Sequence, residues 1–318
     1  MRRPDYVARA DCEAVLTAAD ALELAERALR WEAEGLVAHP EPRALKLRPE
    51  GTSFRFHSKA VALPEIGVAG VRVVGYRSEP DGRRPGAEDA TRIIVLMDLE
   101  TGFPLAFVDE HHNYSLRTAA SVAVGARMLA GAPARIGLIG AGAIAASVVP
   151  TMLAALPGSS IALTSRTLAK AEPLAAEART LTDGDVRIVG GADELLGACD
   201  VIVTATTARA PIIAGPLPAG VLVCALGSNE LDAAAYLSAD RLIVDDWEQT
   251  RRSGDVSAMI AAGEDIRGRL AGELPELVAG RLPGRRDAGE RIVLRTEGLA
   301  SQDILLAHRA WQLTAAAA

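Results

Sequence analysis

A glycine-rich stretch in the middle of the chain has the residue types and spacing that bind a dinucleotide. Residues 140–145 read Gly-Ala-Gly-Ala-Ile-Ala and directly follow the apolar run Ile136–Ile139. Glycines here allow a tight turn and a close approach of the backbone to a pyrophosphate, which the first N–H groups of the following helix would bind. This pattern between a strand and a helix predicts a nicotinamide-dinucleotide site. The residues expected to contact the cofactor there are Gly140, Gly142, Ala143 and Ile144.

The end of the next expected strand bears on which cofactor is used. Sites selective for NAD usually carry an acidic residue about 20 positions after the glycines, where it binds the ribose 2′-hydroxyl. No Asp or Glu occurs between Gly140 and Glu172. That place holds Ser165, Arg166 and Thr167 instead. A guanidinium and two hydroxyls suit a 2′-phosphate, so we predict that NADP(H) is preferred and that NAD(H) is possible. The alternative is that Arg166 stacks on the adenine or points to solvent.

A further run of small and hydroxyl residues follows the strand candidate Val201–Thr204. Thr204, Ala205 and Thr206 fall at its carboxyl end, where ligands collect in open α/β sheets. We expect their hydroxyls and backbone groups to line the cofactor. Ordinary turn chemistry at a strand end is the alternative.

Four cationic residues in the first 120 positions indicate a second binding function. They are Arg43, Lys59, Arg72 and Arg117. Lys59 and Arg72 each interrupt an apolar strand pattern, and Arg117 opens an apolar helix. Buried cations are costly unless they pair with acids or bind an anion, and the carboxylate of a substrate would supply that anion. The alternative is pairing with internal acids such as Asp98 or Asp109.

The first third of the chain has the texture of an α+β sheet structure that would carry these cations. Apolar residues at helical spacing predict helices at 12–36 and 115–130. The polar, Pro- and Gly-rich stretch 78–91 is expected to be a loop that shapes the substrate pocket together with residues 111–114. The β-rich runs between turn residues predict strands at 43–47, 54–63, 67–76 and 92–98.

From residue 134 the pattern changes to apolar strands that alternate with helices. Such alternation predicts an α/β fold of Rossmann type, a doubly wound parallel sheet with helices on both faces. Residues 280–291 are expected to form a loop, and residues 302–314 a last helix. The expected strands are 136–139, 161–164, 186–189, 201–204, 221–226 and 242–244, with helices at 143–156 and 167–180.

Composition limits the class of protein. The 318 residues are 49% hydrophobic and 24% charged, which is ordinary for a soluble globular protein. The net charge of −7 and the lack of a long basic run disfavour nucleic-acid binding. Three scattered cysteines and the adjacent His111 and His112 show no metal-ligand spacing, so no metal is expected. No apolar stretch of about 20 residues occurs, so we expect a cytoplasmic protein without a membrane partner.

Several motifs together resemble the ornithine cyclodeaminase/mu-crystallin family, in the same order, over residues 40–310. The most specific is Arg117-Thr118-Ala119-Ala120, which stands a short distance before the glycine-rich turn. The others are the residues around Arg43, His57-Ser58-Lys59-Ala60, Gly70-Val71-Arg72-Val73, Leu96-Met97-Asp98 with Thr101-Gly102, Gly140-Ala141-Gly142, Thr204-Ala205-Thr206-Thr207, and Gly298-Leu299-Ala300 with Gln302-Asp303.

The resemblance implies a homodimer whose chains each have a Rossmann domain and a discontinuous substrate and dimerisation domain, closed by the C-terminal helix. By this likeness residues 126–299 form the dinucleotide-binding domain, and residues 1–125 with 300–318 form the other. Members of the family bind NAD(H) or NADP(H) and convert amino acids, keto acids and cyclic imines. The positions that match the family's carboxylate-binding residues are Arg43, Lys59 and Arg117, and Lys59 is also a candidate for proton transfer.

Departures from the family pattern bear on the reaction type. Cyclodeaminases of this kind carry an Asp, followed by Pro-Gly-Lys, where this chain has Asn229. An asparagine cannot take up a proton from an attacking amine or water, so ring-closing deamination is disfavoured. Arg72 replaces a lysine that many relatives carry.

Other groups could take over the acid–base work. Glu230 and His57 are the candidates. Glu230 suits a helix cap equally well, because Ser228 or Asn229 resembles an N-cap before a helix at 231–238.

The predicted function is an NAD(P)H-dependent imine or ketimine reductase, or an amino-acid dehydrogenase, that moves hydride at the α-carbon of a small amino or imino acid. One alternative is an ornithine- or lysine-type cyclodeaminase that recycles its NAD internally. The other is a non-catalytic protein that binds a dinucleotide and a small ligand. The catalytic candidates are Lys59, Arg117, Asn229 and Glu230, and the substrate-binding candidates are Arg43, Lys59, Arg72 and Arg117.

Overall fold

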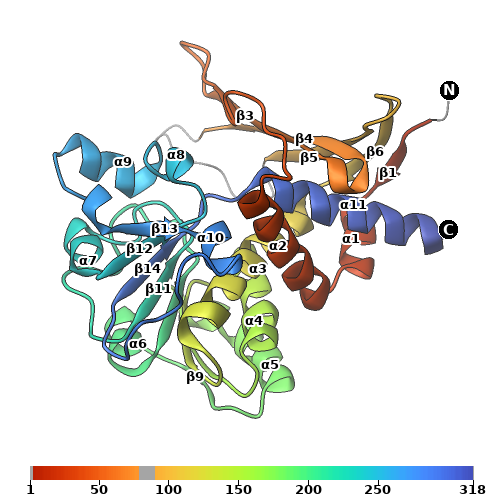
Figure 1. The fold of residues 1–318 in the computed structure, drawn as a ribbon. Helices are drawn as coiled ribbons and strands as arrows, with labels where there is room; N and C mark the ends of the chain where they lie inside the picture. Colours follow the sequence, from red (N-terminus) through yellow and green to blue (C-terminus); the bar gives the residue numbers. More distant parts are fainter. Residues whose placement is uncertain (1–2, 79–89, 318) are drawn as a thin grey trace. The chain divides into compact units, whose positions relative to one another are not determined.

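The computed structural model describes residues 3–78 and 90–317. The chain divides into two compact units (Figure 1). Unit 1 comprises Met1–Arg117 and Leu299–Ala318, and unit 2 comprises Thr118–Gly298. The first boundary falls inside the helix α3 (His111–Ala130), eight residues before the predicted one, because that helix runs on from one unit into the other.

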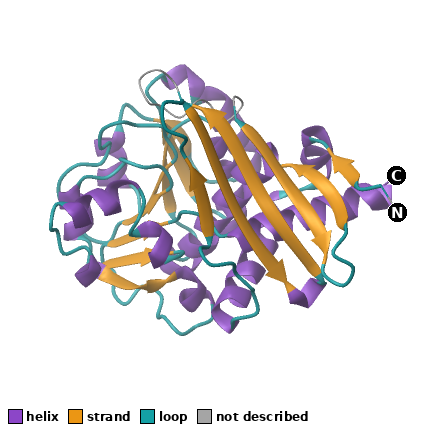
Figure 2. Ribbon diagram, turned by 90° about the horizontal axis from the view of Figure 1, so that it is seen from above, coloured by secondary structure: helices purple, strands orange, loops and turns teal. Residues whose placement is uncertain are grey.

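Unit 1 is built on a six-stranded sheet in the order β1-β6-β5-β4-β3-β2. Only β1 and β6 pair in parallel among these described strands, and the other neighbours are antiparallel. Figure 2 shows the long strands of this sheet side by side. The strands are β1 (Asp5–Val7), β2 (Ala44–Leu47), β3 (Phe54–Leu63), β4 (Val68–Arg77), β5 (Thr91–Asp98) and β6 (Pro104–Asp109).

One face of this sheet is covered by the C-terminal helix α11 (Ala300–Ala317), which contacts β3, β4 and β5 and also helix α2. Alternate residues of β4 and β5 are buried under it, as the two-residue period of a strand requires. Gly70 permits this contact, because a Cβ atom there would lie 2.5 Å from Cδ1 of Ile304. The strand predictions for this unit hold, and most of the predicted loop 78–91 lies outside the described residues.

The helix predicted at 12–36 is wrong as a single helix. Two helices stand there, α1 (Arg9–Val15) and α2 (Ala18–Glu34). Thr17 separates them because it is the N-cap of α2, where its hydroxyl accepts a hydrogen bond from Asp20 N at 3.1 Å. The signal was present in the sequence as Thr-x-x-Asp, but the apolar spacing on both sides concealed it.

Unit 2 contains the predicted doubly wound parallel sheet, with eight strands in the order β13-β12-β14-β11-β10-β7-β8-β9. Strand order reverses between β7 and β10, which are direct neighbours. The α/β fold class is therefore confirmed. The strands are β7 (Arg135–Ile139), β8 (Ser160–Thr164), β9 (Val186–Ile188), β10 (Val201–Thr204), β11 (Leu222–Ala225), β12 (Arg241–Val244), β13 (Leu270–Glu273) and β14 (Ile292–Arg295).

The helices of unit 2 follow the strands in the usual alternation. The predicted helix at 167–180 is interrupted, since a 3₁₀ turn η3 (Leu168–Lys170) precedes α5 (Glu172–Leu181). Two strands, β13 and β14, were not predicted. The helices are α4 (Ala143–Ala155), α5, α6 (Ala192–Ala198), α7 (Ala233–Ser238), α8 (Trp247–Thr250), α9 (Gly254–Ala261) and α10 (Leu274–Val278), with a 3₁₀ turn η4 (Arg267–Arg269).

Candidate active site

The glycine-rich turn lies between β7 and α4 of unit 2, as predicted. Gly140 has φ 128°, a conformation that favours glycine, and its N–H donates to Thr164 O at 2.8 Å. A Cβ atom at Gly140 would lie 2.3 Å from Ala205 O, so a side chain is excluded by the neighbouring backbone. Gly142 is the N-cap of α4 and has no side chain to cap the helix. The first N–H groups of α4 could therefore donate to a bound anion.

The turn after β10 lies directly beside the glycine-rich turn. Ala205 N donates to Ile139 O at 2.8 Å, which joins the carboxyl ends of the two strands where the strand order reverses. Open α/β sheets bind ligands outside such a switch point. The structure therefore brings the residues predicted to contact the cofactor to one edge of the sheet, and their contacts with a cofactor remain a prediction. They are Gly140, Gly142, Ala143, Ile144, Thr204, Ala205 and Thr206.

Ser165, Arg166 and Thr167 follow β8 at the same edge. Arg166 and Thr167 are exposed. The Ser165 hydroxyl donates to Thr167 O at 2.7 Å, so this proton is already used within the turn. An exposed guanidinium next to the first turn is compatible with a 2′-phosphate.

Glu230 does not have the access that an acid or base acting on a substrate needs. Its side chain is fully buried, at 0% exposure. Its carboxylate accepts four hydrogen bonds, from Thr204 Oγ1 at 2.6 Å, Thr206 N at 2.7 Å, Thr206 Oγ1 at 2.9 Å and Gly227 N at 2.6 Å. This geometry favours a positioning role over the acid–base role predicted for it.

Asn229 lies in the turn after β11, exposed and with φ 63°. The following helix α7 begins at Ala233, and its N-cap is Asp232, whose carboxylate accepts from Ala235 N at 2.7 Å. The predicted cap at Ser228 or Asn229 is therefore wrong. The residues between Asn229 and the helix place the Glu230 side chain in the interior before α7 begins.

Arg295, at the end of β14, was missed by the sequence reasoning. It is 1% exposed, and its guanidinium donates to the carbonyls of Ala225 and Gly227 and to Glu297 Oε1. Tyr236 OH donates to Asp255 Oδ2 at 3.1 Å, and that carboxylate lies 3.9 Å from Arg295 Nη2. Burial raises the pKa of both Asp255 and Tyr236. The only sequence signal was an arginine after a run of three apolar residues.

In unit 1 the predicted cations Arg72 and Arg117 lie together and share an acid from the C-terminal helix. Asp303 Oδ1 is 2.6 Å from Arg117 Nε, and Asp303 Oδ2 is 3.7 Å from Arg72 Nε. Glu110 also forms an ion pair with Arg72. These four residues are at most 5% exposed. Arg72 and Arg117 thus pair with internal acids, which was the alternative reading of these cations. The acids are Glu110 and Asp303 and not the suggested Asp98, which binds Thr101, or Asp109, which binds His111.

Three guanidinium groups of this cluster lie near one tyrosine ring. Arg92, Arg117 and Arg72 place their Cζ atoms 4.0, 5.0 and 5.4 Å from the centre of the Tyr114 ring, a distance range typical of cation–π contacts. Burial raises the pKa of the Glu110 carboxyl. Burial acts to lower the pKa of Arg72, but the neighbouring Glu110 and Asp303 outweigh it and raise that pKa.

The remaining predicted substrate residues lie on neighbouring strands. Lys59 is 6% exposed, and its Cα is paired across β3 and β4 with that of Arg72. Arg43 is exposed and directly precedes Ala44, whose Cα partner is Lys59. The backbone thus brings Arg43, Lys59 and Arg72 to one region of the sheet. The sequence reasoning missed Arg92, Glu110 and Asp303, of which only Asp303 stood in a quoted motif.

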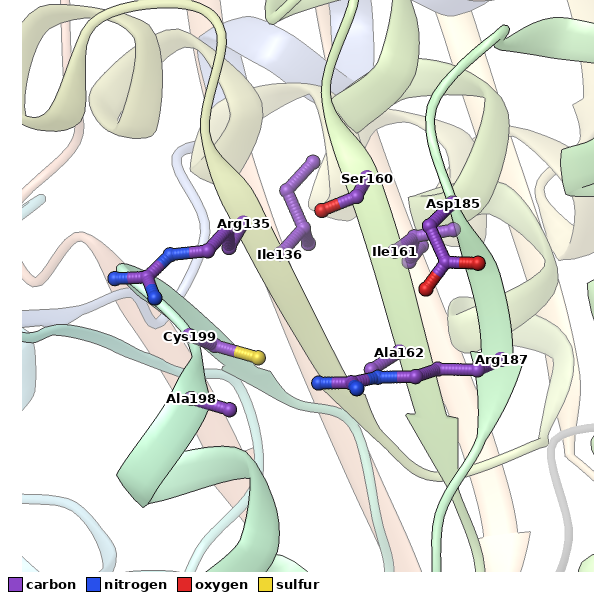
Figure 3. A pocket seen from close by; sticks show the side chains of 9 residues that line it. All are labelled: Arg135, Ile136, Ser160, Ile161, Ala162, Asp185, Arg187, Ala198 and Cys199. Atoms are coloured by element: carbon purple, nitrogen blue, oxygen red, sulfur yellow. The ribbon is translucent and has the colours of Figure 1, made fainter.

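A small cavity of about 220 Å³ in unit 2 lies away from the carboxyl edge of its parallel sheet (Figure 3). Arg135 and Ser160, which line it, are the first residues of β7 and β8. The carboxyl ends of these strands, which carry the glycine-rich turn, are at the opposite edge of the sheet. Figure 3 shows Arg187 extending across Ala162, in the direction of Cys199. The cavity is therefore separate from the glycine-rich turn.

Among the residues that the structure describes, no helix is long and apolar enough to cross a membrane. No cluster of three or more histidine, cysteine or acidic side chains arranged for a metal ion occurs in 3–78 or 90–317.

The chain resembles characterised reductases and dehydrogenases over most of its length. It is 28% identical over 265 residues to a Δ1-pyrroline-2-carboxylate reductase of Bacillus cereus, covering 81% of this chain and 80% of that protein. It is 27% identical over 310 residues to an alanine dehydrogenase of Archaeoglobus fulgidus, covering 93% and 91%. It is 25% identical over 294 residues to an N-((2S)-2-amino-2-carboxyethyl)-L-glutamate dehydrogenase of Staphylococcus aureus, covering 88% and 87%.

Solved structures show the same fold. The Δ1-pyrroline-2-carboxylate reductase of Thermococcus litoralis, in complex with NADH and L-proline, superposes with a TM-score of 0.87 at 24% identity, covering 98% of both chains. An archaeal alanine dehydrogenase dimer with bound NAD gives 0.86 at 24% identity, covering 99% of this chain and 97% of that one. The model of the ornithine cyclodeaminase/mu-crystallin family matches residues 3–313. The chain therefore belongs to the ornithine cyclodeaminase/mu-crystallin family.

Proposed function

We propose that this protein is an NAD(P)H-dependent oxidoreductase that reduces the C=N bond of a small imino acid, or oxidises the corresponding amino acid. The observation that carries the proposal is the buried pair Arg72 and Arg117 in a chain that also has a dinucleotide-binding turn. Arginine forks match the geometry of a carboxylate. The characterised relatives are pyrroline-carboxylate reductases and amino-acid dehydrogenases, which supports this reaction class.

In the proposed reaction the two units have separate tasks. Arg72 and Arg117 of unit 1 hold the carboxylate, with Arg43 and Lys59 as further candidates. A reduced nicotinamide bound at the glycine-rich turn would supply the hydride for the imine carbon, and a proton would be added to the nitrogen. Lys59 is the candidate for holding that proton. Fixing both reactants would supply much of the rate.

The geometry around Asn229 does not favour a cyclodeaminase. An exposed amide stands where such enzymes carry a carboxylate, and an amide cannot act as a base at neutral pH. Glu230 cannot replace it in this arrangement, because its carboxylate is buried and accepts four hydrogen bonds.

For the cofactor we propose a preference for NADP(H), with NAD(H) as the alternative. Structural relatives are bound to NADH or NAD. In this chain the turn after β8 carries the exposed Arg166 in place of an acid, which favours a 2′-phosphate over a 2′-hydroxyl.

The test is a fluorescence titration of the purified protein with NADPH and NADH, followed by a panel of cyclic imines, keto acids with ammonia, and amino acids. We expect tight NADPH binding and oxidation of NADPH that depends on a cyclic imine. Release of ammonia from ornithine or lysine, without net change in reduced nicotinamide, would instead identify a cyclodeaminase. Binding without turnover of any compound would support a non-catalytic role.

We also propose a homodimer formed through the face of the unit 1 sheet that is opposite to α11. Cross-strand pairing places Tyr6 beside Phe107, and Leu47 beside Phe56, on the face opposite to α11. Tyr6 is 65% and Leu47 55% exposed, which is unusual for large apolar residues on a sheet. A structural relative is a dimer.

Light scattering is expected to give twice the mass of one chain at micromolar concentration. Phe107→Glu should shift the protein towards monomer, because it places a charge on this face. Phe103→Glu is the control, since Phe103 is exposed in the turn after β5 and outside the face. A wild-type monomer would contradict the proposal.

A further inference from the structure

We propose that Glu230 is a positioning residue that fixes the nicotinamide half of the dinucleotide site. It would do so by joining the turn after β10 to the turn after β11. The inference rests on the proposed function, because it assumes that the glycine-rich turn binds a dinucleotide.

The four donors around Glu230 call specifically for a carboxylate. Oε1 accepts from the N–H and the hydroxyl of Thr206, and Oε2 accepts from the Thr204 hydroxyl and the Gly227 N–H. An ionised carboxylate only accepts hydrogen bonds and has about four lone-pair positions, so all four donors are satisfied. A glutamine would turn an NH₂ group towards one of the backbone N–H groups and leave a buried donor unsatisfied.

The two turns that Glu230 joins lie on one side of the switch point. The pyrophosphate turn follows β7, and the residues that reach the adenine ribose follow β8 on one side of β7. The strands β10 and β11 lie on its other side. A dinucleotide that crosses the switch point therefore places its nicotinamide half against the turns that Glu230 holds.

A second buried group holds the same peptide from the other side. The Gly227 N–H donates to Glu230, and the Gly227 carbonyl accepts from the Arg295 guanidinium. A Cβ atom on Gly227 would lie 2.7 Å from Glu230 Cδ, so the carboxylate packs directly against this glycine. Both hydrogen-bonding groups of residue 227 are thus fixed by buried charges, immediately before Ser228 and the exposed Asn229.

The experiment compares the affinity for NADH with the affinity for ADP-ribose, which lacks the nicotinamide. If NADPH binds better, the comparison is between NADPH and 2′-phospho-ADP-ribose. We expect Glu230→Gln to weaken NAD(P)H binding about tenfold or more, because the cost of one unsatisfied buried donor is of the size that a tenfold change represents. Affinity for ADP-ribose should stay within about twofold. Thr206→Val, which removes one of the four donors, should give a smaller change in the same direction.

Glu290→Gln is the matched control. Glu290 is also buried, at 2% exposure, and accepts from Arg286, but it lies just before β14 at the opposite edge of the sheet. The Glu290→Gln variant should lower the melting temperature without changing the ratio of the affinities for the cofactor and for ADP-ribose.

Two results have distinct meanings. If Glu230→Gln and Thr206→Val weaken ADP-ribose and cofactor equally, Glu230 is only structural and the inference is wrong, while the proposed function stands. If the wild-type protein binds neither cofactor nor ADP-ribose, the proposed function itself fails.

Discussion

A Gly142→Val variant is expected to fold normally and to lose nearly all affinity for NAD(P)H. A Cβ atom at Gly142 meets nothing within 4 Å, and φ is −96°, which any residue adopts. The protein without cofactor therefore tolerates the side chain. A bound pyrophosphate requires the backbone to come close at this second glycine, and the valine would fill that space. We expect a loss on the order of 100-fold, or about 2.7 kcal/mol, in a fluorescence titration.

Gly140→Ala provides the contrasting variant. Its Cβ would lie 2.3 Å from the Ala205 carbonyl oxygen, and φ 128° is unfavourable for alanine. The variant should lose stability by about 1–3 kcal/mol, in addition to losing cofactor. Thermal unfolding followed by circular dichroism separates the two cases. A Gly142→Val protein that binds NADPH like the wild type would show that the pyrophosphate does not lie at this turn.

The position of the glycine-rich turn could be predicted because its pattern is local in sequence. Strand, turn and helix are consecutive, and the glycine requirement at 140 arises from a neighbouring strand end that the parallel-sheet pattern implies. The fold class followed from the same alternation of apolar runs.

Charged residues that meet only through the tertiary fold could not be predicted. Asp303 is nearly 190 positions from Arg117, and no spacing rule connects a C-terminal helix to the middle of the chain. Glu230 is an acid–base candidate in the sequence because it follows Asn229, which stands where related cyclodeaminases carry an Asp, whereas its burial depends on donors from Thr204 and Thr206. Strand β14 was missed because it has only three apolar residues, which are bounded by Arg291 and Arg295.

Asp303→Leu is expected to have the largest effect on stability in unit 1. Asp303 is 1% exposed and lies 2.6 Å from Arg117 and 3.7 Å from Arg72. Removing one member of a buried ion cluster leaves uncompensated charge, which costs about 3–5 kcal/mol. Urea unfolding followed by circular dichroism measures the change in the free energy of unfolding. Glu23→Gln is the control, since Glu23 is half exposed and pairs with Arg27 and with Arg309 at the surface, and its change should alter stability by about 1 kcal/mol or less.

The same position also tests the role of the two arginines in binding. If Arg72 and Arg117 hold the substrate carboxylate, Asp303→Asn, which keeps the side-chain size, should raise KM for the imino acid while leaving cofactor affinity unchanged. The reason is that Asp303 orients both guanidinium groups from α11, and cofactor binding is assigned to unit 2. The measurements are KM for the imino acid and the NADPH dissociation constant, each for the wild-type protein and for Asp303→Asn. A variant with unchanged KM would mean that these arginines serve the structure of unit 1 and that the carboxylate is bound elsewhere.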